Sequence, residues 1–281
     1  MKLSVCHYSY HRTWEQEGWN CMQLAEETKA AGAVAIDFHV RFLGDLSTAE
    51  GRISNALSST GLTLSGLSLS NNFNTEDPAE HNAQVEAVKA CIRLASAVGA
   101  PNSRIFGGHL EPGDDGTRLR AGRQRILDGL GEVVRDAEAH GVILALENHG
   151  GLPCRAEEQV EVIEAIGSPN LMATIDLGNY MQCGQEGHDG MAIAAPHAAY
   201  IHVKDFRKKD GWRADKPCFG EMEPCTVGRG DVDVAACVDV LRGIDYQGFI
   251  ALEYEGPDDE RKGVEESLDF MYTVLRPDEA G

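Results

Sequence analysis

Residues 142–151 read VILALENHGG, an apolar run that ends abruptly in Glu147, Asn148 and His149. A short apolar run that closes on polar residues is typical of a buried strand in a parallel sheet. The residues before it, 117–140, carry apolar side chains at helical spacing, which predicts a helix with one face on the sheet. Gly141 separates the two, as expected where a left-handed helix end favours glycine. The segment is therefore a helix followed by a strand.

The same unit recurs along the chain. Strands are expected at residues 2–7, 33–39, 63–69, 103–107, 142–147, 172–176, 200–204 and 248–253. Strands that alternate with helices predict an α/β fold, and eight units fit closure into a (β/α)8 TIM barrel that forms one domain over residues 1–281. An open doubly wound sheet is the alternative. No GxGxxG turn follows the first strand, which argues against it.

Composition limits the partners and the compartment. The 45 acidic against 25 basic residues give a net charge of −20, which repels nucleic acid and anionic membrane surfaces. No run of 18 apolar residues is present, so no membrane span is expected. The start, MKLSVCHYSY, has no secretory signal pattern, which predicts a cytoplasmic protein. Eight scattered cysteines without a CxxC pair are interpreted as reduced thiols.

Four successive strand ends carry side chains that bind metals: Glu147, Asp176, His202 and Glu253. In a barrel the carboxyl ends of the strands meet at one mouth, so the four side chains are expected around one point. Each acid alone has an ordinary alternative as a helix cap or a surface ion pair. Together, three carboxylates and one imidazole predict one divalent metal ion, Mn²⁺ first, with Mg²⁺, Co²⁺ or Zn²⁺ as alternatives.

Further candidates flank these ligands. His149 and Lys204 lie two residues after Glu147 and His202 and share their direction along the strand. His149 is a candidate acid/base or hydroxyl-binding group, and the alternative is a structural hydrogen bond. Lys204 is a candidate for an enolate oxygen or a carboxylate, with an ion pair to Asp205 or Glu255 as the alternative.

Polar residues near strand ends in the first half of the chain are weaker candidates. They are expected either to bind sugar hydroxyls or to be satisfied structural groups: His7, His39, Asn71 and His109.

A long connection, residues 205–230, follows the seventh strand and has few periodic apolar residues. Such a loop is typical of a lid, a binding loop or a subunit contact, which points to a homo-oligomer, or else of a flexible insertion. Arg229 within it is a candidate for an anionic substrate group, with a surface turn as the alternative.

The ligand motifs carry a family resemblance over nearly the whole chain. ENHGG at 147–151, TIDLGN at 174–179, HVKD at 202–205 and EYEG at 253–256 resemble, in the same order, the xylose isomerase-like TIM-barrel superfamily. That group includes sugar isomerases and epimerases, inosose dehydratases and endonuclease IV. The resemblance implies that Glu147 and Glu253 act as an acid/base pair on a metal-chelated carbohydrate. Asn179 stands where some epimerases carry a substrate-binding histidine.

The function expected is therefore a divalent-metal-dependent isomerase or epimerase of a ketose or related polyol, acting by proton transfer through a cis-enediolate. The alternative is a metal-dependent lyase or dehydratase on a keto-sugar, an inosose or a keto-glycoside, in which His149 protonates the departing oxygen. A nuclease needs a basic groove, which the acidic chain does not offer. The intact ligand set argues against a barrel that only binds sugar.

Overall fold

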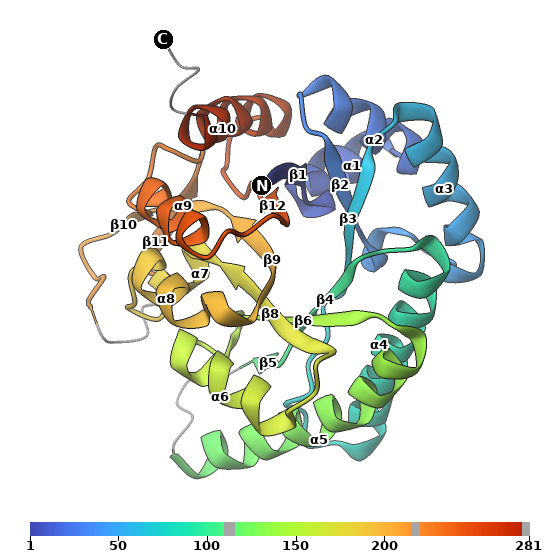
Figure 1. Ribbon diagram of the computed structural model, residues 1–281, viewed down its shortest axis with the longest axis vertical. Coiled ribbons are helices and arrows are strands. Elements are labelled where there is room, and N and C mark those ends of the chain that lie inside the picture. Colours follow the sequence, from blue (N-terminus) through green and yellow to red (C-terminus); the bar gives the residue numbers. More distant parts are fainter. Residues whose placement is uncertain (110–115, 215–219, 277–281) are drawn as a thin grey trace.

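A closed barrel of parallel strands forms the centre of the molecule, and helices surround it (Figure 1). The structure is a computed structural model and describes residues 1–109, 116–214 and 220–276. The strands close in the order β1-β12-β9-β8-β6-β4-β3-β2. Their bounds are β1 Lys2–Val5, β2 Ala35–His39, β3 Thr63–Ser68, β4 Asn102–Phe106, β6 Ile143–Glu147, β8 Leu171–Asp176, β9 Ala198–Val203 and β12 Phe249–Leu252. The barrel and its eight strands confirm the sequence prediction.

Amphipathic helices cover the outside of the barrel. They are α1 His11–Glu17, α2 Cys21–Ala30, α3 Ala49–Thr60, α4 Pro78–Val98, α5 Gly116–His140, α6 Ala156–Ile166, α7 Leu177–Gln182, α8 Gly187–Ala194, α9 Val234–Gly243 and α10 Glu260–Leu275. The stripe predicted on α5 is buried, from Ile126 to Ala137. Gly99 and Gly167 end α4 and α6 at φ of 68° and 67°, a conformation that other residues seldom adopt. None of the helices in the described ranges is long and apolar enough to cross a bilayer.

Polar side chains form a buried hydrogen-bonded group inside the barrel. Ser65 Oγ lies 2.6 Å from Ser4 Oγ and 2.9 Å from the Tyr200 hydroxyl, and all three side chains are fully buried. The ring of His202 lies above Tyr200, with centroids 5.0 Å apart. These hydrogen bonds satisfy polar groups that would otherwise be costly to bury. Ser4, Ser65 and Tyr200 thus form a hydrogen-bonded group that contacts His202 through the Tyr200 ring.

The connection after β9 is more ordered than expected. Residues 205–230 were predicted as a long loop, but β10 (Asp205–Lys208) and β11 (Met222–Cys225) pair there as an antiparallel hairpin. Each strand has only four residues, and buried and exposed side chains do not alternate along it, so the sequence offers no strand periodicity here. Residues 215–219 of the predicted loop lie outside the described part. A second pair, β5 (Gly108–His109) with β7 (Gly151–Leu152), also sits at the mouth.

Asp205 anchors the end of this connection to the barrel. Its carboxylate accepts backbone N–H bonds from Phe206, Gly228 and Gly230 at 2.9 Å and from Val232 at 3.1 Å. At Gly230 a Cβ would lie 2.1 Å from an oxygen of Asp205, so glycine permits the close approach. The Asp205 carboxylate thus accepts hydrogen bonds from four backbone N–H groups that would otherwise need water as their acceptor.

We expect Asp205→Ala to lower the free energy of unfolding by about 2–4 kcal/mol, because charge-assisted bonds to buried N–H groups are lost. Urea unfolding measures the change, with the exposed Asp210→Ala variant as control. An Asp205→Ala protein as stable as the control would contradict the anchoring role.

Candidate metal centre

The four expected ligand residues lie together at the barrel mouth. Glu147 ends β6, Asp176 ends β8, His202 lies near the end of β9 and Glu253 follows β12. These four strands are neighbours in the barrel, so residues far apart in sequence meet. One ligand atom from each lies within 4.8 Å of the others, and all four residues are buried. The four donor atoms lie close enough together to bind one ion.

The atoms that face the centre of this cluster are poorly satisfied by protein. His202 Nδ1 lies 3.7 Å from Glu147 Oε1 and 3.8 Å from Glu253 Oε2. His202 Nδ1 is buried without a hydrogen-bond partner, and so is Asp176 Oδ2, whose one close cation is the Lys204 ammonium at 3.1 Å. Buried polar atoms are normally paired, so unpaired ones that converge point to a missing ligand. Carboxylate oxygens and an imidazole nitrogen suit a divalent cation.

Two buried cationic side chains compensate part of the negative charge. Lys204 Nζ lies 3.1 Å from Asp176 Oδ2, 2.5 Å from Glu253 Oε2 and 2.9 Å from Glu255 Oε1. Arg104 Nε lies 3.1 Å from Glu147 Oε2. When Glu147, Asp176, Glu253 and Glu255 are all ionised and the His202 ring is neutral, as in a metal ligand, Arg104 and Lys204 leave two negative charges. The donor set and this charge both fit one divalent cation.

The acid pKa values reflect the same electrostatics. Burial, with the charges of Glu147 and Glu253, raises the pKa of Asp176 to about 7. Burial opposes ionisation of Glu253, but Lys204, His202 and Arg104 together outweigh it and lower the pKa of Glu253 to about 2. For Glu147, Arg104 and His202 outweigh burial and hold its pKa well below the usual range. Of these three acids, Asp176 is therefore the one whose charge is most disfavoured by burial and neighbouring carboxylates, even with Lys204 3.1 Å away.

Two asparagines fix the ligand loops. The Asn148 amide donates to the backbone oxygen of Asp176 at 3.0 Å and accepts from its backbone N–H at 2.9 Å. Asn179 Nδ2 donates to Glu147 Oε1 at 3.1 Å. The backbone N–H of Asn179 donates to Asp176 Oδ1, and Asp176 thereby caps the N-terminus of α7. Asn179 thus contacts a ligand residue. Asn148 was not among the predicted site residues, although its place directly after Glu147 was the available signal.

Comparison with known proteins fixes the family. Residues 25–274 match the family model described as xylose isomerase-like TIM barrel. The chain belongs to this family. A curated relative, SgbU of Escherichia coli, assigned as an L-ribulose-5-phosphate 3-epimerase, is 26% identical over 205 residues, covering 70% of this chain and 68% of SgbU.

Solved structures agree on the fold. A structure of L-ribulose 3-epimerase superposes with a TM-score of 0.77 at 18% identity, covering 99% of this chain and 97% of that one. The structure of IolI protein with a bound zinc atom superposes with a TM-score of 0.75 at 17% identity, covering 99% of each chain. At these identities the likeness concerns the fold alone.

His149 of this xylose isomerase-like barrel lies beside the ligands. Its ring stacks on Phe106 with centroids 3.9 Å apart and planes inclined by 5°, and the ring of His109 stands edge-on at 5.8 Å. His149 Nδ1 is buried without a hydrogen-bond partner. Burial lowers the pKa of His149 to about 4, so the imidazole is neutral near pH 7. His149, Asn148 and Asn179 line a cavity of about 130 Å³.

The other sequence candidates lie in structural contacts. Asn71 exchanges both amide hydrogen bonds with the backbone of Phe106. His7 is fully buried, accepts from the backbone N–H of His39, and burial lowers its pKa to about 3. Arg229 is exposed and pairs with Glu266 at 2.9 Å. These contacts match the structural alternatives but do not test substrate binding, which stays a prediction for these residues, whereas Lys204 lies in the cluster.

Sequence reasoning missed Arg104. It lies in the middle of β4 and is 2% exposed, yet its guanidinium reaches Glu147. No signal in the run NSRIF separates an inward-facing arginine from a surface one. Only the closed barrel shows that it points to the site.

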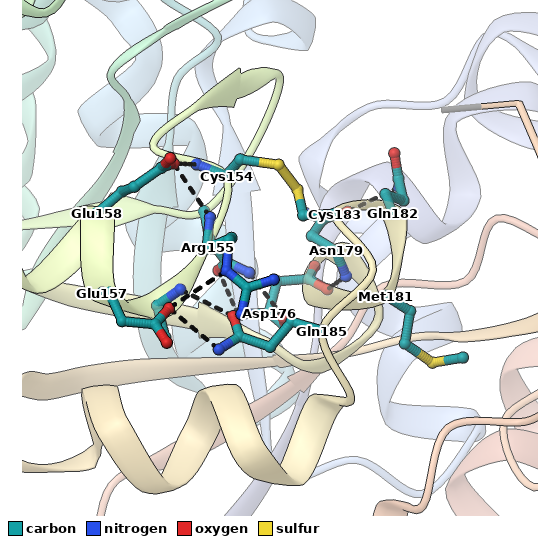
Figure 2. The surroundings of a disulfide bond; sticks show 12 residues. Cys154, Arg155, Glu157, Glu158, Asp176, Asn179, Met181, Gln182, Cys183 and Gln185 are labelled. Atoms are coloured by element: carbon teal, nitrogen blue, oxygen red, sulfur yellow. Dashed lines mark hydrogen bonds and ion pairs between the residues drawn. A yellow bond between two sulfur atoms is a disulfide. The ribbon is translucent and has the colours of Figure 1, made fainter. Parts of the chain in front are cut away.

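One disulfide corrects the prediction that all cysteines are reduced. Cys154 and Cys183 are bonded, and both belong to segments that follow a ligand residue, Glu147 and Asp176 respectively. Figure 2 shows the bond beside Asn179 and the polar contacts of Arg155. The partners are 29 residues apart, and only the neighbouring strands β6 and β8 bring them together. Spacing alone therefore did not indicate the pair.

We expect a divalent cation to stabilise the folded chain through this cluster. Mn²⁺ at about 100 times its Kd should raise the free energy of unfolding by about 2.7 kcal/mol, because it binds the folded state. Differential scanning fluorimetry with and without EDTA measures the shift, and Asp176→Asn should abolish it. The surface variant Glu161→Gln is the control. An equal shift in Asp176→Asn would reject the site.

We expect removal of the disulfide to lower stability by about 3 kcal/mol, since it closes a loop of roughly 30 residues in the unfolded chain. The Cys154→Ala/Cys183→Ala variant is compared with wild type in urea, with and without dithiothreitol. Dithiothreitol should lower the free energy of unfolding of wild type to that of the double variant, and it should leave the free energy of unfolding of the double variant unchanged. A reductant effect of equal size on both proteins would argue against this bond.

Proposed function

We propose that this protein is a divalent-metal-dependent isomerase or epimerase of a ketose or related polyol. The observation that carries the proposal is the pair Glu147 and Glu253, whose carboxylates flank one imidazole nitrogen of His202 within a single buried cluster. Paired carboxylates suit removal and return of a proton beside a carbonyl. The family and the curated relative support a sugar substrate.

The two glutamates reach the site from the outer strands of the ligand set, β6 and β12, with β8 and β9 between them. A substrate held between them presents one face to each carboxylate. One glutamate removes a proton from the carbon beside the carbonyl, and the other returns a proton to the opposite face. Glu147, Asp176, His202 and Glu253 would hold the cation, which would polarise the carbonyl as a Lewis acid.

Lys204 and the neighbouring polar groups complete the proposed site. The Lys204 ammonium is buried between the Asp176 and Glu253 carboxylates, and a donor there stabilises negative charge on a substrate oxygen. Asn179 and His149 line the adjoining cavity and are proposed to bind hydroxyl groups. Arg229 and His109 remain weaker proposals for the outer part of a substrate.

For the metal we propose Mn²⁺, because three carboxylates and one imidazole form a hard ligand set, with Mg²⁺ and Co²⁺ next. Zn²⁺ is a further candidate because the similar IolI structure contains zinc. The lyase alternative is the weaker one. It needs a protonated His149, and burial of that imidazole favours its neutral form.

We expect wild type to exchange solvent deuterium into one carbon of its ketose, and Glu147→Gln and Glu253→Gln each to lower that rate by about 10²- to 10⁴-fold, since each amide cannot transfer the proton. Mass spectrometry across a panel of ketoses and inososes measures exchange. Glu161→Gln is the matched surface control. Exchange at wild-type rate in both site variants, or an unsaturated product instead, would overturn the isomerase assignment.

A further inference from the structure

Arg104 is a buried charge on a strand that supplies no member of the ligand cluster. Its side chain is fixed by distinct contacts. Nη1 donates to the backbone oxygen of Leu69 at 3.1 Å, and Nε lies 3.1 Å from Glu147 Oε2. A guanidinium stays protonated in proteins, so Arg104 is charged even where it is buried. One nitrogen of the charged guanidinium is thus held by the Leu69 backbone, while another lies against the Glu147 carboxylate.

The same guanidinium also contacts an aromatic ring. Its central carbon lies 4.4 Å from the centroid of Phe106, two residues along β4, and Phe106 is 5% exposed. Phe106 in turn stacks on His149 at 3.9 Å with nearly parallel planes. Cation–π contact and offset stacking both favour a defined ring orientation. Arg104, Phe106 and His149 therefore form a continuous series of contacts.

We propose that Arg104 is a positioning residue that sets the orientation of both Glu147 and His149. It holds Glu147 through the ion pair and the plane of His149 through Phe106. Glu147 Oε1 is left to face His202 and Asn179. The proposal rests on the proposed function only in treating Glu147 and His149 as working groups. Strand β4, which supplies none of the four proposed ligands, would thus contribute to the site by positioning two of its residues.

Positioning and simple charge make opposite predictions for cation binding. A fixed positive charge near the cluster repels a divalent cation, so removing it would tighten binding. If Arg104 instead holds Glu147 in place, removing it weakens binding, because groups behind metal ligands typically contribute 10- to 100-fold in affinity or activity. Lysine keeps the charge but lacks the planar group that stacks on Phe106.

The first test is titration calorimetry of the metal-free full chain with MnCl₂. We expect Arg104→Met to bind Mn²⁺ about 10- to 100-fold more weakly than wild type. The control is Arg123→Lys on α5, where the ion pair to Glu161 is exposed. Circular dichroism checks folding of each variant. Equal or tighter Mn²⁺ binding by folded Arg104→Met would overturn the proposal for Glu147.

The second test needs neither metal nor turnover. In protein labelled with ¹³C at histidine rings, the ring current of Phe106 shifts the His149 resonance, which is assigned by its loss in His149→Gln. We expect Phe106→Leu and Arg104→Lys to move this resonance toward that of the exposed His140, whereas Arg123→Lys leaves it in place. An unmoved His149 resonance in folded Arg104→Lys would overturn the link through Phe106.

The two tests separate the failure of this inference from that of the proposed function. Should wild type bind no Mn²⁺ in calorimetry and exchange no deuterium, the proposed function fails while the histidine resonance still decides the positioning role. Should Arg104→Met be unfolded, Arg104→Lys retains the buried charge opposite Glu147 and decides through the same resonance and through Mn²⁺ affinity.

Discussion

The burial of several carboxylates at one end of the barrel is the constraint on which the rest of the site depends. Charged groups taken out of water are costly unless they are paired. Glu147 forms an ion pair with Arg104, and Glu253 forms one with Lys204. Asp176 shares Lys204 and has a raised pKa, so it remains the least compensated acid. Arg104 and Lys204 therefore balance only part of the negative charge that the ionised cluster would carry.

Barrel closure creates this centre from residues that local structure would keep apart. Each ligand stands at or next to a strand end, and the neighbouring order of β6, β8, β9 and β12 turns four strand ends into one cluster. The Asn148 amide then ties the end of β6 to that of β8. The Cys154–Cys183 bond joins the segments that follow these strands. The two ligand loops are held by hydrogen bonds and by a covalent link.

The sequence predicts what depends on local pattern and misses what depends on distant partners. Apolar runs that end in glutamate, aspartate or histidine identify the strands and the ligands, because strand-end position and barrel closure are sufficient to place them. The role of Arg104 could not be predicted, because the local sequence does not show whether an arginine within a strand faces the barrel interior or the surface. The disulfide and the β10–β11 hairpin depend on pairings that sequence spacing does not reveal.

The two halves of the barrel also differ in what they contribute. The second half supplies the acids and the imidazole, whereas the first half supplies Arg104 from β4, which compensates without binding a cation. If the protein cations neutralised every carboxylate, a metal would gain nothing by entering. When the four carboxylates are ionised, Arg104 and Lys204 balance two of the charges; a divalent ion would balance the other two, whereas a monovalent ion would balance one. Partial compensation by protein cations is thus compatible both with burial of the acids and with the proposed divalent cation.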